Sequence, residues 1–419
     1  MAQLSDDCFA FSGPLMPIEE MERLIAERVQ PVTGKETVAV REAEGRVLAA
    51  DVIAPIDLPP FDNSAVDGYA VCHRDLKPDA DTRLAVSGRV LAGHRPPQAI
   101  AAGEAIRIFT GAAMPAGTDT VFMQEDVKAD GGTVTLPPGL KVGANRRLAG
   151  EDVKAGAVAL PAGRVLTAAD VALAAALGLT QLEATPRLRV ALFSTGDEIV
   201  EPGGPRPPSA LFDANRALLS VLLARMGAVV SDLGIVADNP EALRRAIGGA
   251  ARNHDLVLTS GGVSTGEADH VRDAVESIGR LVFWRVAIKP GRPVAMGVIE
   301  GAAFAGLPGN PVAAFVTFVR VVRPLLLRLA GAQPQPLLPL PVRAAFAYKK
   351  KAGRREYVRV ALRRTADGTV EAVKHPQEGA GVITSLTETD GLAEIADETT
   401  RVEPGATIGF LSYASLLGR

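Results

Sequence analysis

The chain has very few of the residues that build disulfide frameworks or zinc centres. Its 419 residues include only two cysteines, Cys8 and Cys72, and its five histidines are scattered along the sequence. Two cysteines are too few for a disulfide framework or a thiolate metal site, so zinc chemistry is not expected.

Long apolar runs and a strong charge bias are also missing. No stretch of about twenty residues is apolar and free of charge, and the first ten residues lack a basic region followed by an apolar one. The formal net charge is only −3, so the chain has no general attraction for nucleic acid or for an anionic membrane. We therefore expect a cytoplasmic protein with no nucleic-acid and no membrane partner.

Two common nucleotide-binding fingerprints are missing as well. No G-x-G-x-x-G motif follows the first strand of the predicted α/β region, and G-x-x-x-x-G-K-[ST] does not occur. This weakens an interpretation as an ordinary dehydrogenase or kinase.

Apolar residues, in contrast, are plentiful and change their pattern along the chain. They make up 47% of the 419 residues, and this length predicts roughly two to four domains. Short β-branched runs between Gly and Pro over 36–165 predict β-rich modules. Beyond Pro186, alternating strands and helices predict a parallel sheet with helices on both faces. After Gly331, a proline-rich linker leads to alternating segments that predict a small β-barrel or sandwich.

The predicted fold is therefore multidomain α/β plus β: a doubly wound α/β domain, β-rich N-terminal subdomains and a C-terminal β-barrel. The predicted domains are an N-terminal region (1–186, with an elongated part of about 1–55 plus 141–186 and a β-rich insert of about 56–140), an α/β domain (187–330) and a barrel (335–419). Helices are predicted at 17–29, 167–178, 213–226, from 239 onward, at 268–278 and at 311–329. Strands of the α/β domain are predicted at 189–194, 228–236, 255–259, 281–288, 294–299 and 303–306.

The segment PFDNSAVDGYA at 60–70 fits neither the period of a strand nor that of a helix. It predicts a loop that presents polar groups, Asp67 among them. The alternative is an Asx-turn loop in which Asp62, Asn63 and Ser64 bond their own backbone. The residues alone leave both interpretations open.

Polar turns follow several strands of the predicted α/β domain, at the edge where open α/β sheets bind ligands. Gly-rich turns let backbone N–H groups approach a phosphate or a heterocycle. The strongest is TSGGVSTGEAD at 259–269, although Ser264 and Asp269 also suit a capped helix start. Candidate binding residues in this turn and in GLPGNP are Ser260, Gly261, Gly262, Ser264, Pro308, Gly309 and Asn310.

Three acids, Glu198, Asp238 and Asp269, lie in separate turns of the same predicted sheet. Carboxylate oxygens are suitable ligands for a hard divalent ion such as Mg²⁺, which bridges substrate phosphates. Asp238 alone could equally be a neighbour of a helix N-cap.

Three cations, Arg285, Lys289 and Arg292, meet at a Pro/Gly corner. They suit the capture of an oxyanion or phosphate in a chain that is otherwise slightly acidic. A solvated basic hairpin corner is the alternative, and the spacing does not separate the two.

Together these segments resemble one family, the molybdopterin molybdenumtransferases, which include the homologous domain of gephyrin. The similar motifs, in order, include PPFDNSAVDGYAV, FSTGDEI, LFDANR, TSGGVSTGEADH, RVAIKPGRPVAMG and GLPGNPVAA. The resemblance runs from about residue 10 to the C-terminus. TSGGVS and GLPGNP also occur in molybdopterin adenylyltransferase domains.

The resemblance implies an elongated homodimer whose active site lies between the α/β domain of one subunit and parts of the other. It implies insertion of molybdate into adenylyl-molybdopterin with release of AMP, supported by Mg²⁺ or another divalent ion. The implied catalytic residues are Asp67, Thr110, Arg285, Lys289 and Arg354. The implied metal ligands are Glu198 and Asp269, and Asp238 and Arg292 are implied to bind substrate.

The chain departs from the family pattern at a few positions. The family commonly has Lys at the positions of Arg285 and Arg292. The positive charge is retained in this chain, but a planar guanidinium replaces the compact ammonium group. Ala380 stands where the family tends to have a serine, and Ser385 is the nearest hydroxyl that could replace it.

Three other functions compete with this interpretation. An adenylyltransferase that makes adenylyl-molybdopterin from ATP would use the same α/β domain, but it would leave the polar loop at 60–70 and the barrel unexplained. A non-catalytic scaffold and a nucleotide hydrolase are the other two. Transient contact with the enzymes of molybdopterin synthesis is a further expectation.

Overall fold

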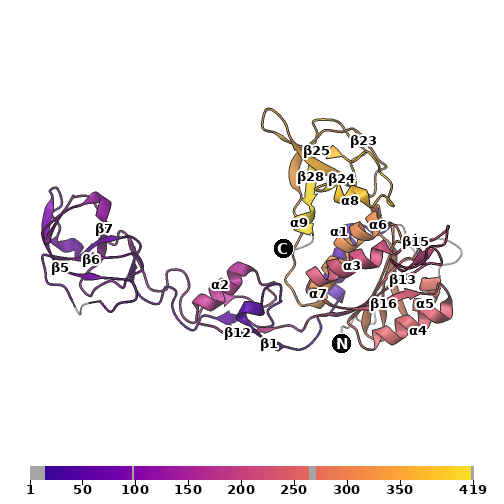
Figure 1. The fold of residues 1–419 in the computed structure, drawn as a ribbon, viewed down its shortest axis with the longest axis horizontal. Coiled ribbons are helices and arrows are strands. Elements are labelled where there is room, and N and C mark those ends of the chain that lie inside the picture. The colour runs from indigo at the N-terminus through magenta and orange to yellow at the C-terminus, as the bar shows by residue number, and fades with distance from the viewer. Residues whose placement is uncertain (1–14, 97–98, 264–269, 417–419) are drawn as a thin grey trace.

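The computed structural model describes residues 15–96, 99–263 and 270–416. Figure 1 shows an elongated molecule with a β-rich lobe at one end and the α/β domain at the other. A small module around α2 lies between them, and the C-terminal barrel lies beside the α/β domain (Figure 1).

The α/β domain is built on a sheet of six strands in the order β16-β13-β17-β21-β20-β18. The four strands β13, β16, β17 and β21 run parallel, as predicted. The same prediction is wrong for β18 and β20, which run antiparallel to their neighbours. The strands are β13 (Arg189–Thr195), β16 (Val229–Val236), β17 (Leu256–Ser260), β18 (Gly279–Arg285), β20 (Pro293–Ile299) and β21 (Ala302–Leu307).

Short connections explain the two antiparallel strands. Only Glu300 and Gly301 join β20 to β21, and both have left-handed backbone angles, with φ of 48° and 86°. A two-residue turn of this kind closes a hairpin, whereas a parallel pair needs a crossover of a dozen or so residues. Residues 286–292, between β18 and β20, are too few for such a crossover.

Helices cover both faces of this sheet, as predicted. Alternate strand residues enter two different cores: Val190 and Leu192 face one, while Ala191 and Phe193 face the other. The first core contains residues of α1 (Ile18–Arg28), α3 (Ala214–Arg225), α6 (Pro311–Thr317) and α7 (Arg323–Leu329). The second contains residues of α4 (Pro240–Ala251) and α5 (His270–Ile278).

Two helices differ from their predicted descriptions. The sequence groups α1 with the N-terminal region, but α1 packs into the α/β core through Met21, Leu24 and Ile25. The helix predicted over 311–329 is interrupted by a π-helical turn at Phe318–Val322. Pro324 lies two residues after the end of this turn, and a proline inside a helix lacks the N–H for the regular bond to the preceding turn.

The C-terminal residues form a closed barrel, which confirms the prediction. β24 pairs with both β25 and β26, so the strands close in the order β24-β25-β22-β28-β26. The short strand β19 (Ile288–Lys289) of the α/β domain pairs with β24 and ties the two domains together. The remaining elements are β22 (Leu340–Ala344), β23 (Tyr348–Lys349), β24 (Arg355–Arg364), β25 (Val370–Lys374), α8 (Thr384–Thr387), β26 (Gly391–Ile395), β27 (Arg401–Val402), β28 (Thr407–Ser412) and α9 (Tyr413–Leu416).

The N-terminal β-rich lobe contains a six-stranded sheet in the order β7-β4-β6-β5-β9-β8, with a small apolar core on each face. Its strands are β4 (Gly68–Val71), β5 (Thr82–Val90), β6 (Glu104–Ile108), β7 (Thr120–Met123), β8 (Lys128–Asp130) and β9 (Thr133–Leu136). The linking module has the two-stranded pairs β1 (Glu36–Ala39) with β12 (Gln181–Ala184) and β2 (Val52–Ile53) with β11 (Val158–Leu160). Its helix α2 (Ala168–Ala176) begins with the predicted cap, because Thr167 and Asp170 form a reciprocal capping box.

No helix within the described ranges has both the length and the apolar character that crossing a bilayer requires.

Candidate active site

The Gly-rich turn after β17 is held close to the neighbouring strand ends. Gly261 has a φ of +92°, and a Cβ atom there would lie 2.2 Å from the carbonyl oxygen of Thr195. The Gly261 N–H donates to the Leu307 carbonyl at 2.9 Å. Only glycine permits this approach of backbone to backbone, which leaves the turn open to a ligand.

Replacing Gly261 with alanine is expected to destabilise the α/β domain by about 2–4 kcal/mol, because it combines a left-handed backbone with a backbone clash. Gly249→Ala is the control, since a Cβ atom at Gly249 in α4 would meet nothing within 4 Å. That variant should be as stable as the original chain or slightly more stable. Midpoints of urea unfolding measure both, and equal midpoints would contradict the proposed close packing of the turn.

Asn215 joins the two Gly-containing turns. Its amide nitrogen donates to Ser260 Oγ at 2.8 Å and to the Gly309 carbonyl at 2.7 Å. Asn215 lies in the first turn of α3, which Asp213 caps by accepting from the Arg216 N–H. The predicted substrate-binding residues Ser260, Gly261, Gly262, Pro308, Gly309 and Asn310 therefore meet at one edge of the sheet.

These turns line a pocket of about 310 Å³, which we call the acid pocket. Its lining includes Glu198, Asp213 and Asp238. The Oδ1 atom of Asp238 is buried and has no hydrogen-bond partner among the described residues. Burial raises the pKa of the Asp238 carboxyl, and the nearby acids Asp197 and Glu198 raise it further, while His270 and the nearby Thr195 side chain act in the opposite direction.

The acid pocket offers oxygen ligands of the kind that Mg²⁺ prefers. Glu198 is exposed at the pocket and the unpaired Asp238 Oδ1 is available for coordination, so the two residues fit such an ion in kind. Within the described ranges, no group of three or more His, Cys, Asp or Glu residues forms a complete metal site. Asp269, the other predicted ligand, and Ser264 lie outside the described residues.

A second pocket, of about 560 Å³, lies between the α/β domain and the barrel, and we call it the cation pocket. Lys289, Arg292, Arg354 and Arg359 are among its lining residues. The acid pocket and the cation pocket share Pro293, Pro308 and Asn310, so they are adjoining parts of one cleft. Arg285, at the end of β18, is exposed but lines neither pocket.

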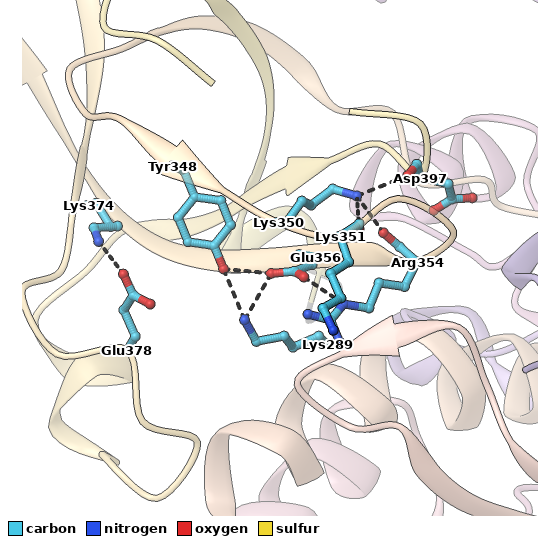
Figure 2. A network of polar contacts seen from close by, with 9 residues as sticks. All are labelled: Lys289, Tyr348, Lys350, Lys351, Arg354, Glu356, Lys374, Glu378 and Asp397. Carbon is cyan, nitrogen blue, oxygen red and sulfur yellow. Dashed lines mark hydrogen bonds and ion pairs between the residues drawn. The ribbon is translucent and has the colours of Figure 1, made fainter. Parts of the chain in front are cut away.

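A buried carboxylate lies behind the cations of this pocket. Figure 2 shows Glu356 between Lys289, Tyr348 and Arg354. One carboxylate oxygen accepts from Tyr348 Oη at 2.6 Å and from Lys289 Nζ at 3.1 Å. The other accepts from Arg354 Nε at 2.7 Å. The barrel and the α/β domain thus supply adjacent cations that share one counter-ion.

Ser385 lies behind the cation pocket rather than on its wall. It is fully buried, accepts from Arg359 Nε at 3.0 Å and donates to the Val382 carbonyl at 2.6 Å. Arg359 also donates to the Gln377 and Gly379 carbonyls, which fixes the turn that carries Ala380. The described position of Ser385 therefore supports Arg359, and its direct contact with substrate stays a prediction.

Asp67 and Thr110 lie together, but in the distant β-rich lobe. Asp67 Oδ1 accepts from the Thr110 N–H at 2.8 Å and from Thr110 Oγ1 at 2.7 Å. Both hydrogen bonds from Thr110 lower the pKa of the Asp67 carboxyl, and the bond from the N–H has the larger effect. β4, which follows Asp67, belongs to the lobe at the far end of the molecule from the cleft (Figure 1). A single chain therefore does not bring Asp67 to Lys289.

Three family models match consecutive parts of the chain. The MoeA N-terminal region (domain I and II) matches residues 16–178, a probable molybdopterin binding domain matches 191–328, and the MoeA C-terminal region (domain IV) matches 341–413. The molybdopterin molybdenumtransferase of Haemophilus influenzae is 37% identical over 406 residues, covering 96% of this chain and 100% of that protein. The chain belongs to the molybdopterin molybdenumtransferase family. The resemblance found in the sequence is thereby confirmed.

Other members of the molybdopterin molybdenumtransferase family agree. The protein of that name from Nostoc sp. PCC 7120 is 38% identical over 303 residues, or 71% of this chain and 70% of that protein. A crystal structure of the molybdopterin biosynthesis moeA protein from Pyrococcus horikoshii aligns with a TM-score of 0.79 at 27% identity. The alignment covers 96% of this chain and all of that one.

The sequence did not identify three residues that line the cleft, Asn215, Tyr348 and Arg359, or the buried Glu356 behind it. Asn215 lies in LFDANR, one of the segments on which the resemblance to the family was based, so this segment gave a usable signal. Tyr348 and Glu356 pair with Lys289 across 59 and 67 residues, and Arg359 pairs with Ser385 across 26 residues. No local pattern indicates these pairings.

Proposed function

We propose that the cleft inserts molybdate into adenylyl-molybdopterin and releases AMP, as the last step of molybdenum cofactor biosynthesis. The chain is a transferase of this pathway by its family, and its substrate is a molybdopterin-related compound. The observation that carries the detailed proposal is the shared lining of the acid and cation pockets. One substrate can therefore extend from a nucleotide and metal end to an oxyanion end.

Molybdate binds in the cation pocket in this proposal. Lys289, Arg292 and Arg354 line that pocket and carry the positive charge that a small dianion needs when it leaves water. Each charge-assisted hydrogen bond would contribute about 1.5–3 kcal/mol. Arg285 lines neither pocket, so its catalytic role stays a prediction.

The pterin and the phosphates lie over the two Gly-containing turns of the acid pocket. The first turn lines the pocket with Ser260, Gly261 and Gly262, and the second with Pro308, Gly309 and Asn310. The cofactor we propose is Mg²⁺ or another divalent ion, held by Glu198 and Asp269 with help from Asp238. When bound, such an ion neutralises charge on the phosphate of the adenylyl group.

A second copy of the chain supplies Asp67 and Thr110, so we propose a homodimer with its active sites at the subunit interface. The distance between the β-rich lobe and the cleft within one chain supports this (Figure 1). Asp67 would position the metal or a water molecule for release of AMP. A cytoplasmic location and transient contact with molybdopterin-synthesis enzymes complete the proposal.

AMP release is the measurement that tests this function. The purified chain, with Mg²⁺ and adenylyl-molybdopterin, is expected to release AMP only when molybdate is added. Incubation with ATP and molybdopterin should yield no adenylyl-molybdopterin, which separates the proposed reaction from that of an adenylyltransferase. AMP release that is independent of molybdate, or adenylylation with ATP alone, would contradict the proposal.

A further inference from the structure

We propose that Glu356 is a positioning residue that sets Lys289 and Arg354 as a matched pair of donors for the oxyanion, with Tyr348 orienting Glu356. This inference rests on the proposed function and adds to it how the cation pocket is organised. It assigns no contact between Glu356 or Tyr348 and the substrate.

Glu356 is isolated from solvent and fully occupied by its three partners. Its side chain is only 1% exposed, while those of Lys289 and Arg354 are 47% and 20% exposed. The acid therefore lies behind the two cations, and the cations separate it from the pocket (Figure 2). A buried carboxylate at this depth is costly unless each oxygen has good hydrogen bonds, and both oxygens have them.

The hydrogen-bond inventory shows which donors remain for a ligand. A lysine ammonium has three protons; two of those on Lys289 point to Glu356 and to Tyr348 Oη, the latter at 3.3 Å. Arg354 uses Nε for Glu356, and among the described residues no hydrogen bond occupies its two terminal nitrogens. One ammonium proton of Lys289 and the two terminal nitrogens of Arg354 thus remain as donors for a ligand in the pocket that both side chains line.

The charge of Glu356 does not by itself favour an oxyanion. A carboxylate beside two cations lowers the positive potential of the pocket, so simple attraction would be stronger without it. Glu356 instead contributes order, because a free lysine side chain loses rotamer entropy when a ligand fixes it. Glu356 imposes that order before the oxyanion arrives, which is the benefit of preorganisation.

The protonation states support this division of roles. Burial raises the pKa of the Tyr348 phenol, and its hydrogen bond to Glu356 raises it further, so the phenol remains a donor. Burial alone would raise the pKa of Glu356, but the hydrogen bonds from Tyr348, Lys289 and Arg354 outweigh it and lower that pKa. Glu356 therefore remains an ionised acceptor at neutral pH.

The backbone register fixes the same arrangement across two domains. Lys289 in β19 is the direct partner of Glu356 in β24, and Tyr348 reaches the pair from β23. The side chains of the pair therefore come from adjacent strands of one sheet, although the strands belong to different domains. The barrel thus holds the lysine in place as well as closing the pocket.

The E356Q substitution tests this role because an amide has only one acceptor oxygen. Its NH₂ group must face either Arg354 Nε or the pair of Tyr348 and Lys289, so at least one donor loses its partner. We expect the KM for molybdate in AMP release to rise about tenfold or more, with a smaller change in kcat. Y348F keeps the ring but removes its hydrogen bond to Glu356 and the oxygen that accepts from Lys289, so the KM should rise about threefold.

E371Q is the matched control for loss of an acid from the barrel. Glu371 also bridges two cations, Arg343 at 2.8 Å and Arg363 at 3.1 Å, and it does not line the cleft. E371Q should leave the KM for molybdate unchanged, even if the barrel unfolds at a lower temperature. If E356Q does not fold, the KM for molybdate of Y348F compared with that of E371Q decides whether Glu356 has the positioning role.

The outcomes separate this inference from the function on which it rests. Suppose that the unmodified chain releases AMP in a molybdate-dependent way. If the KM for molybdate of E356Q and of Y348F is then equal to or below that of the unmodified chain, the positioning role alone is overturned. No molybdate-dependent release by the unmodified chain would overturn the proposed function together with this inference. A raised KM in both variants and an unchanged KM in E371Q would support it.

Discussion

Replacing Lys289 with alanine is expected to lower molybdate-dependent AMP release by about 10- to 100-fold at subsaturating molybdate. The change removes one charge-assisted donor from the cation pocket and leaves Glu356 with a cation on one oxygen only. Initial rates over a range of molybdate concentrations, at saturating adenylyl-molybdopterin, measure the loss. Binding of adenylyl-molybdopterin itself should remain, because we propose that its phosphates lie over the turns of the acid pocket.

Lys349→Ala controls for the loss of a nearby positive charge. Lys349 follows Tyr348 in β23 and is exposed, and the alternation of a strand directs it away from the side of Tyr348. It does not line the cleft, so its removal should change the rate little. Equal losses in the two variants would mean that general charge, and not the position of Lys289, governs molybdate binding.

Asp67→Ala is expected to lower AMP release by at least about tenfold in a homodimer of the variant, because every active site then lacks this acid. Its most informative use is in a mixed dimer with Lys289→Ala. One cleft of such a dimer combines an intact Lys289 with an intact Asp67 from the other chain, while its second cleft lacks both. Mixed dimers isolated through two different tags should therefore recover about half of the activity of the unmodified dimer.

A dimer of Lys289→Ala with Arg354→Ala provides the matched control for this recovery. Both residues line the same pocket of one chain, so neither cleft of that dimer is intact. It should stay as inactive as the single variants. Recovery in the control, or no recovery in the Asp67 and Lys289 mixture, would contradict an active site shared between subunits.

The sequence was most informative where structure depends on local chemistry. Asp213 and Asn239 were expected to begin α3 and α4, and both side chains accept the expected backbone N–H. The Gly-rich turn after β17 and the barrel were expected from glycine placement and strand alternation, and both are present. Such features depend on neighbours a few residues away, so a short sequence pattern can indicate them.

Features that depend on distant partners were not predictable in this way. Alternating strand and helix patterns suggested parallel pairing throughout, whereas the turn at Glu300 and Gly301 reverses the chain at β20. The apolar face of α1 could be read from its sequence, but not the core that it enters. Glu356 gives no local signal either, because its role arises from pairing with Lys289, which lies 67 residues away. Burial of an acid becomes understandable only when its partners are known.

Anomalous diffraction from a crystal grown with AMP, Mg²⁺ and tungstate tests whether the cation pocket binds the oxyanion beside the nucleotide, because tungstate is a heavy tetrahedral dianion like molybdate. We expect one tungsten site in the cation pocket, within hydrogen-bonding reach of Lys289 and Arg354, with AMP over the Gly261 turn of the adjoining acid pocket. Tungstate bound outside the cation pocket, with no contact to Lys289 or Arg354 in their present positions, would contradict the proposed oxyanion site.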